Sequence, residues 1–239
     1  MITGMRLHRF YNKDLNLENK ITLNNKDYFE TAHQILNVFR AKEGDSFIFF
    51  NCLDSYDYVY ELKDLSKKEL TFNLKDKLDK SQNIKTENNI TLCQSIIKKD
   101  NFELVIRQMV EAGVQSVIPL ITDRSEKKLL NRARLSKIII EATEQSGRND
   151  IMKLEDTLKI EEVLKREGRK VVFDTIEKKS GLTENKINSD LYIFVGPEGG
   201  WTNEEKKIFE ENDFNFRTLP TYTLRAETAA ISAVIYVLK

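Results

Sequence analysis

The sequence predicts an α+β protein with two domains, and three features of the chain point to this fold class. Short strand-like runs with one helical stretch among them fill the first 75 residues, which is typical of a small β-barrel. From residue 89 onward, strands of the buried type alternate with helices, which indicates a mainly parallel α/β sheet. The stretch between them is polar, as in a linker or surface loop. We therefore expect a β-barrel at 1–75, a linker at 76–88 and an α/β domain at 89–239.

The N-terminal domain begins with a basic and aromatic stretch, residues 6–11, which contains Arg6 and Arg9. Apolar residues recur at close to helical spacing over residues 27–38, so we expect the single helix of this domain there. Its strands are expected at residues 17–23, 46–50, 56–62 and 69–74.

The second domain changes to a pattern in which helices separate the strands. A helix over residues 101–112 places Phe102, Val105 and Ile106 on one side, and Gly113 follows as its C-cap. The other expected helices cover residues 129–145, 161–167, 202–212 and 226–238. The expected strands cover residues 90–96, 114–121, 170–173, 191–195 and 216–219.

The composition excludes several classes of protein. The chain has 38 basic and 38 acidic side chains, which argues against a uniformly basic nucleic-acid binder but permits a locally basic face. No apolar run approaches the roughly 18 residues that span a bilayer, and the N-terminus lacks the apolar core of a signal peptide, so we expect a cytoplasmic protein. Cys52 and Cys93 are expected to be buried thiols. Together with His8 and His33 they are too few to predict a metal site or a nucleophilic triad.

A glycine-rich turn at residues 196–200 is the strongest local signal. An apolar strand ends at Val195, Gly196 and Pro197 follow, and Glu198, Gly199 and Gly200 precede the start of a helix. Glycines at such a turn let the backbone approach a ligand at the carboxyl end of a strand. Neither a P-loop nor a dinucleotide fingerprint is present, so a ligand held by backbone groups is favoured over a phosphate. A purely structural turn is the alternative.

A second stretch, residues 219–231, has the same layout. A strand is expected to end at Leu219, a polar loop follows, and small side chains open a helix that allows close approach of backbone or ligand. Leu224, Arg225 and Thr228 lie in this stretch. Arg225 is a candidate functional cation, although an ion pair with Glu227 is an equally good explanation of it.

A third region, residues 122–148, combines strand and helix ends with basic side chains. Thr122 and Arg124 follow a strand, and Arg148 follows a long helix. Residues 124–148 contain seven Lys or Arg against three Glu, an excess that suits contacts with RNA phosphates. A solvated helix face is the competing explanation.

These stretches resemble the SPOUT class of RNA methyltransferases, and more closely the RsmE family, which methylates N3 of a uridine in bacterial small-subunit (16S) ribosomal RNA. The resemblance covers nearly the whole chain. It is carried by residues 6–11, 33–45, 118–125, 141–148, 194–201 and 224–230. It implies a PUA-like β-barrel, an α/β domain with a trefoil knot, S-adenosyl-L-methionine as the cofactor, 16S rRNA or the small ribosomal subunit as the partner, and a homodimer.

Carried onto this chain, the resemblance implies three groups of site residues. The catalytic candidates are Arg148 and Arg225. The residues implied to contact RNA are Arg6, Arg9, Arg40, Arg124 and Arg148. Those implied to bind the cofactor are Thr122, Val195, Gly196, Glu198, Gly199, Gly200, Leu219, Leu224, Arg225 and Thr228.

The chain departs from the family pattern at three positions. Pro220 stands where the family often has Gly, and Gln108 and Ala112 stand where it often has Lys and Leu. No motif is lost as a whole. Two alternatives are a non-catalytic RNA-binding knot protein and a SPOUT methyltransferase that acts on another RNA.

Overall fold

The computed structural model describes residues 7–24, 26–66, 69–80, 89–126, 129–175 and 190–238. Contacts within the chain divide it into two compact units. The first unit comprises Met1–Asn83 together with Thr143–Asp150. The second comprises Ile84–Ala142 and Ile151–Lys239. The α+β class with two domains is thereby confirmed.

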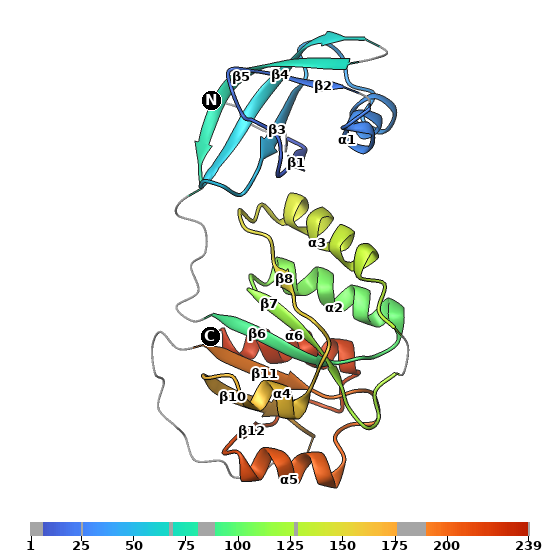
Figure 1. Ribbon diagram of the computed structural model, residues 1–239, viewed down its shortest axis with the longest axis vertical. Helices are drawn as coiled ribbons and strands as arrows, with labels where there is room; N and C mark the ends of the chain where they lie inside the picture. The colour runs from blue at the N-terminus through green and yellow to red at the C-terminus, as the bar shows by residue number, and fades with distance from the viewer. Residues whose placement is uncertain are drawn as a thin grey trace. The chain divides into compact units, whose positions relative to one another are not determined.

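The first unit is built on a five-stranded sheet with the order β1-β3-β4-β5-β2 (Figure 1). Strand β1 runs parallel to β3, and the other neighbours are antiparallel. The sequence does not predict β1, because three residues are too few to show a periodic pattern. The strands are β1 Arg9–Tyr11, β2 Lys20–Asn24, β3 Ser46–Phe50, β4 Tyr56–Leu65 and β5 Glu69–Asp79.

Aromatic rings fill the core of this unit. Phe49 packs edge-on against Phe72 with ring centroids 5.3 Å apart, a geometry that aromatic pairs prefer. The helix expected at residues 27–38 is present in two parts. A short α-helix, α1 Phe29–His33, continues into a π-helical turn, η1 Gln34–Val38, and buries Ala32 and Ile35.

The observed division of the chain differs from the expected one in two places. Strand β5 continues past residue 75 to Asp79, because its outer half still pairs with β4, where Tyr56 lies opposite Asp79. The segment Thr143–Asp150 groups with the first unit, although it lies within the stretch expected to form the α/β domain. Most of the expected linker, residues 81–88, lies outside the described residues.

The second unit has a parallel sheet, as expected. Its strand order is β12-β10-β11-β6-β7-β8. Strand β9 also pairs with β7, at the carboxyl end of that strand, whereas β8 pairs with its start. All these pairings are parallel, so the carboxyl ends of the strands share one edge. The strands are β6 Ile90–Ser95, β7 Ser116–Ile121, β8 Lys153–Leu154, β9 Leu158–Lys159, β10 Arg169–Phe173, β11 Leu191–Val195 and β12 Asn215–Arg217.

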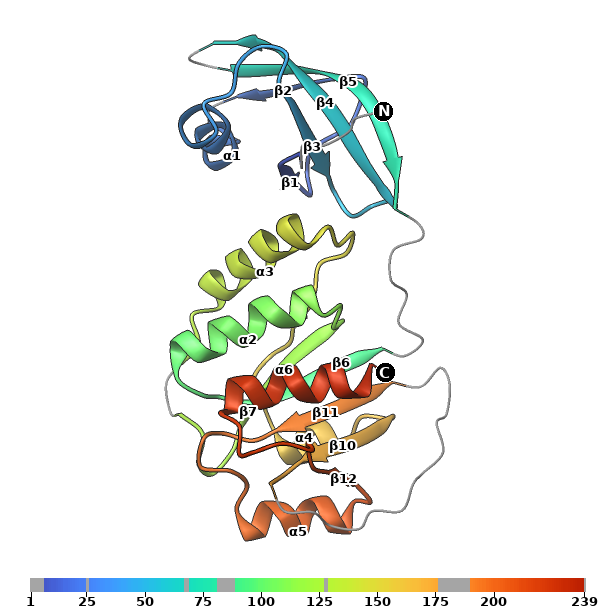
Figure 2. The same ribbon diagram turned by 180° about the vertical axis from the view of Figure 1, so that it is seen from behind.

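Helices cover both faces of this sheet. They are α2 Lys99–Glu111, α3 Arg132–Ser146, α4 Ile160–Leu164, α5 Asn203–Glu211 and α6 Ala226–Val237. Strand residues alternate between two cores: Ile193 packs with the buried side chains of α2, α3 and α6, whereas Phe194 packs with those of α4 and α5. Helices α2 and α6 lie side by side over the first face (Figure 2). The strand expected at 216–219 ends earlier, at Arg217, so Thr218 and Leu219 belong to the following loop.

Candidate cofactor site

A cavity of about 810 Å³ opens where β10, β11 and β12 end at their carboxyl edge. Parallel α/β sheets bind ligands at this edge, and the volume lies in the range of small-molecule sites, roughly 300–1,000 Å³. The lining residues come from the loops after the three strands and from the N-terminal ends of α2 and α6. They are Lys98, Asn101, Phe173, Asp174, Thr175, Val195, Gly196, Pro197, Glu198, Gly199, Gly200, Trp201, Thr218, Leu219, Thr221, Tyr222, Thr223, Leu224, Arg225, Ala226 and Ala229.

The glycine turn forms one wall of the cavity, and its conformation requires glycine at more than one position. Gly200 has a φ of +68°, and its N–H donates to the Pro197 carbonyl at 2.9 Å. A Cβ atom on Gly196 would lie 3.2 Å from the Trp201 ring. That ring is buried, and its Nε1–H donates to the Phe173 carbonyl at 3.0 Å. The turn is therefore held tightly against Trp201.

Glu205 ties the glycine turn to the loop after β7. Its Oε2 accepts the Thr202 N–H at 2.8 Å and, with the Thr202 hydroxyl accepting the Glu205 N–H, completes a capping box at the start of α5. Its Oε1 accepts the Asp123 N–H at 2.9 Å. Arg124 in the same loop donates from Nη1 to the Gly199 carbonyl at 2.7 Å. The two loops thus form one hydrogen-bonded structure.

We expect Glu205→Ala to lower the free energy of unfolding by about 2–4 kcal/mol, because two backbone donors lose a buried carboxylate acceptor. Urea unfolding followed by circular dichroism measures this loss. Glu204→Ala is the matched control, since Glu204 is an exposed acid in the same first turn of α5. Equal losses in the two variants would show that only charge near the helix N-terminus matters.

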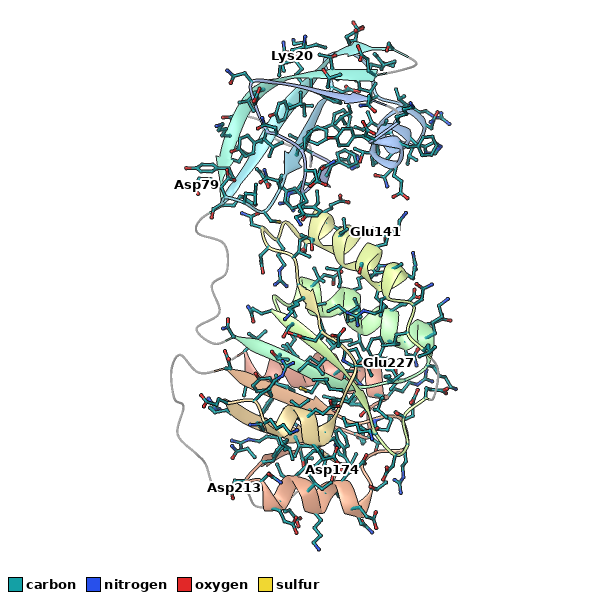
Figure 3. All side chains as sticks on the ribbon, viewed as in Figure 1. Lys20, Asp79, Glu141, Asp174, Asp213 and Glu227 are labelled. Carbon is teal, nitrogen blue, oxygen red and sulfur yellow. The ribbon has the colours of Figure 1, made fainter. Side chains whose placement is uncertain are left out.

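The loop between β12 and α6 forms the facing wall. Leu219 and Leu224 contribute apolar surface, and Arg225 is the N-cap residue of α6 with an exposed side chain that lines the cavity. Glu227, labelled in Figure 3, is buried, and its Oε2 has no hydrogen-bond partner. No ion pair between Arg225 and Glu227 is present within the described part of the chain.

Most of the residues expected to bind the cofactor gather at this cavity. Those that line it are Val195, Gly196, Glu198, Gly199, Gly200, Leu219, Leu224 and Arg225. Thr122 and Thr228 do not line it: Thr122 is buried in the loop after β7, and Thr228 is exposed in the first turn of α6. Their proposed contact with the cofactor stays a prediction.

The sequence does not single out Phe173, the last residue of β10, or the two residues that follow this strand. Phe173, Asp174 and Thr175 line the cavity (Asp174 is labelled in Figure 3). Asp174 pairs with Lys206 of α5 at 2.7 Å. The expected strand at 170–173 could have indicated these residues. In a parallel sheet, the carboxyl end of that strand lies at the same edge as the glycine turn.

The expected RNA contacts lie in different places. Arg40 is exposed and has a φ of +53°, and Arg124 is exposed beside the glycine turn. Arg148 belongs to the first unit, where its Nε and Nη2 donate to Asp150 at 2.9 and 2.6 Å. Arg9 is buried and ion-paired. Arg6 lies outside the described residues.

The two cysteines are protonated thiols rather than nucleophiles. Burial strongly raises the pKa of Cys93, which is fully enclosed. Burial, with a smaller contribution from Asp150, raises the pKa of the half-buried Cys52 to about 11. Since the thiolate is the reactive form, neither side chain is suited to covalent catalysis at neutral pH.

We expect native Cys52 to react with iodoacetamide about 100-fold more slowly at pH 8 than a thiol with a pKa of 9, because a raised pKa leaves less thiolate. The rate should rise about tenfold per pH unit up to pH 10. Mass spectrometry of the alkylated protein measures it, and the urea-unfolded chain is the control. A native rate equal to the unfolded rate at pH 8 would contradict this expectation.

The fold and the cavity together define an α/β protein with a candidate ligand site at the carboxyl edge of a parallel sheet. The sequence model of the RNA methyltransferase domain matches residues 85–238, which is most of the chain and includes the whole cavity. The protein is therefore an RNA methyltransferase. No helix within the described ranges is long and apolar enough to cross a membrane. The same ranges contain no group of three or more His, Cys, Asp or Glu side chains that could hold a metal ion.

The chain belongs to the ribosomal RNA small subunit methyltransferase E family. It is 34% identical to the Rickettsia conorii member over 98% of this chain and 96% of that protein. It is 29% identical to the Bacillus subtilis member over 87% and 88% of the two chains. The crystal structure of the Neisseria gonorrhoeae member, bound to S-adenosyl methionine, matches with a TM-score of 0.82 and 27% identity, covering 97% of both chains.

Proposed function

We propose that the protein transfers a methyl group from S-adenosyl-L-methionine to N3 of a uridine in bacterial small-subunit (16S) ribosomal RNA. The cavity between the glycine turn and the loop before α6 carries the proposal, since the relative solved with S-adenosyl methionine is similar over 97% of this chain. The family name supports ribosomal RNA as the substrate. A substrate of this kind also supports a cytoplasmic location.

The residues around the cavity fit this cofactor. A Cβ on Gly199 would lie 3.1 Å from Arg124, and one on Gly196 would press on Trp201, so the turn presents bare backbone to the cavity. The backbone of residues 196–200 and of Leu219 and Leu224 would hold the adenosine part. When bound, the cofactor supplies an electrophilic methyl group on its sulfonium.

Arg225 is the cation that we assign to the reaction. N3 of uracil must lose its proton to a nearby basic group or to water, and negative charge then spreads onto O2 and O4. A guanidinium at the cavity wall stabilises that charge as it develops. Arg225 is exposed at the N-cap of α6, with no hydrogen bond from its side chain to the helix end, so it is available to the uracil.

We assign Arg148 to the same reaction or to RNA binding, and we propose that the protein is a homodimer. Helix α6 exposes large apolar side chains that suit a subunit interface, Ile235 at 45% and Tyr236 at 46%. Sedimentation equilibrium tests the dimer, and a monomer at micromolar concentration would contradict it.

The remaining assignments concern RNA binding and chain topology. Residues 1–79, up to the end of β5, are proposed as a PUA-like RNA-binding barrel, and residues 89–239 as a SPOUT domain with a trefoil knot. The strand order supports the knot, because β11 lies between β6 and β10 while α6 returns to pack against β6 and β11. The RNA contacts proposed are Arg6, Arg40, Arg124 and Arg148. Arg9 was also expected to contact RNA, but its side chain is buried and paired with Asp57.

The reaction is tested on small ribosomal subunits from a strain that lacks the methyltransferase. Purified protein and S-adenosyl-L-methionine are added, and the nucleosides of the rRNA are analysed by mass spectrometry. We expect N3-methyluridine. Ribose methylation, or a methylated base other than uracil, would overturn the proposed product. Calorimetry with S-adenosyl-L-methionine completes the test, because a protein that binds RNA but not the cofactor is no methyltransferase of this kind.

A further inference from the structure

Arg9 makes an extensive set of side-chain contacts within the described part of the first unit. Its Nε and Nη2 donate to the two oxygens of Asp57 at 2.9 and 2.7 Å, the parallel geometry that arginine prefers with a carboxylate. The side chains of Arg9 and Asp57 are only 8% and 2% exposed. The guanidinium also lies 4.1 Å from the centre of the Phe50 ring. All three guanidinium nitrogens are occupied, which leaves Arg9 poorly placed to bind a phosphate.

The other contacts of Arg9 are with the segment Thr143–Asp150, which belongs to the same unit. Its Nη1 donates to the carbonyls of Thr143 and Glu144 at 3.0 and 3.3 Å. These carbonyls lie in the last turn of α3, where carbonyl groups can accept hydrogen bonds from outside the helix. Helix α3 has no basic residue of its own in that turn. Arg9 therefore supplies, from strand β1, both the donors and the positive charge that a helix C-terminus requires.

The chain beyond the helix is held by the same guanidinium. Gly147 reverses direction with a φ of +82°, and Arg9 Nη2 then donates to the Arg148 carbonyl and to Asn149 Oδ1, both at 3.2 Å. The neighbouring Tyr11 N–H donates to Glu144 Oε1 at 2.8 Å. Hydrogen bonds from Arg9 and Tyr11 of strand β1 thus hold the backbone conformation of residues 144–149.

We propose that Arg9 is a positioning residue for RNA methylation that acts through Arg148. Locked by Asp57, its guanidinium fixes the backbone of Arg148, whose side chain is 8% exposed and pairs with Asp150 at 2.6 Å. The proposal rests on the proposed function, in which Arg148 serves the reaction or the RNA. It replaces a direct Arg9–phosphate contact with an indirect role.

A double-mutant cycle tests this role. Arg9→Lys keeps the charge but cannot make the forked contacts, and we expect it to lower kcat/KM for the small subunit at least about tenfold, since small errors in positioning are costly. The affinity for S-adenosyl-L-methionine should be unchanged. In an Arg148→Ala background, adding Arg9→Lys should change kcat/KM less than about twofold, because the two residues act as one unit. Additive losses would overturn the proposal and support an independent RNA contact.

Hydrogen exchange gives a readout that does not depend on activity. Peptides covering residues 140–150 should exchange at least about tenfold faster in Arg9→Lys and in Asp57→Asn than in the wild type. Lys63→Ala is the control, because it removes an exposed ion pair with Glu61 in the same unit. Unchanged exchange in both variants would overturn the proposal. A third outcome is faster exchange in the variants together with a wild-type protein that makes no methylated uridine. That outcome would show that the proposed reaction is wrong and that the Arg9 contacts are still correct.

Discussion

Arg225→Ala is expected to lower kcat for uridine methylation by about 10²–10³-fold, the effect of removing one group that stabilises developing charge. The side chain is exposed at the cavity and makes no capping bond to α6, so the thermal unfolding midpoint should stay within about 2 °C of the wild type. The rate is measured by transfer of a labelled methyl group to small ribosomal subunits. Cofactor affinity is measured separately by calorimetry.

The separation of rate from binding decides what Arg225 does. If Arg225 holds only the cofactor, Arg225→Ala raises the dissociation constant and leaves kcat at saturation unchanged. Arg225→Lys should restore part of the rate, because an ammonium keeps the charge but loses the planar fork. Lys207→Ala is the matched control, since Lys207 is an exposed cation on helix α5 that does not line the cavity and pairs only with Glu211 among the described contacts. A wild-type kcat in Arg225→Ala would remove the assignment.

The glycine-turn wall of this site illustrates what local sequence signals can predict. A strand of five apolar residues, a Gly-Pro stop and a Thr-x-x-Glu capping box are all local, and strand β11 and the start of α5 lie where these signals place them. The parallel order of the sheet brings the ends of β10, β11 and β12 together, which is why the glycine turn and Arg225 meet at one cavity.

Other features depend on contacts between distant residues and leave no periodic trace. Arg9 and Thr143 are 134 positions apart in the chain, and a basic N-terminal residue is as easily explained by RNA binding as by a helix cap. The π-helical turn at Gln34–Val38 keeps the apolar spacing of an ordinary helix well enough to be mistaken for one. The placement of Arg148 in the first unit follows from the Arg9 contacts and could not be predicted from its motif.

The aromatic cluster behind the glycine turn, formed by Trp201, Phe209 and Phe214, is expected to contribute strongly to stability. Phe209→Ala should lower the free energy of unfolding by about 3–5 kcal/mol, the usual cost of truncating a buried phenylalanine. Phe209 is completely buried, and its ring centroid lies 4.9 Å from that of Trp201 and 4.8 Å from that of Phe214. Because Trp201 in turn supports Gly196, the loss should also weaken binding of S-adenosyl-L-methionine.

Two measurements separate the effect on the core from the effect on the site. Urea unfolding followed by circular dichroism gives the stability. Fluorescence of Trp201, the one tryptophan of the chain, reports on the wall of the cavity under native conditions. Phe29→Ala is the control, because Phe29 is 65% exposed and its removal should change stability by less than about 0.5 kcal/mol. Phe209→Ala could lower stability and leave both Trp201 fluorescence and cofactor affinity unchanged. In that case the glycine turn would be held by the Trp201–Phe173 hydrogen bond and by its own backbone, not by the aromatic cluster.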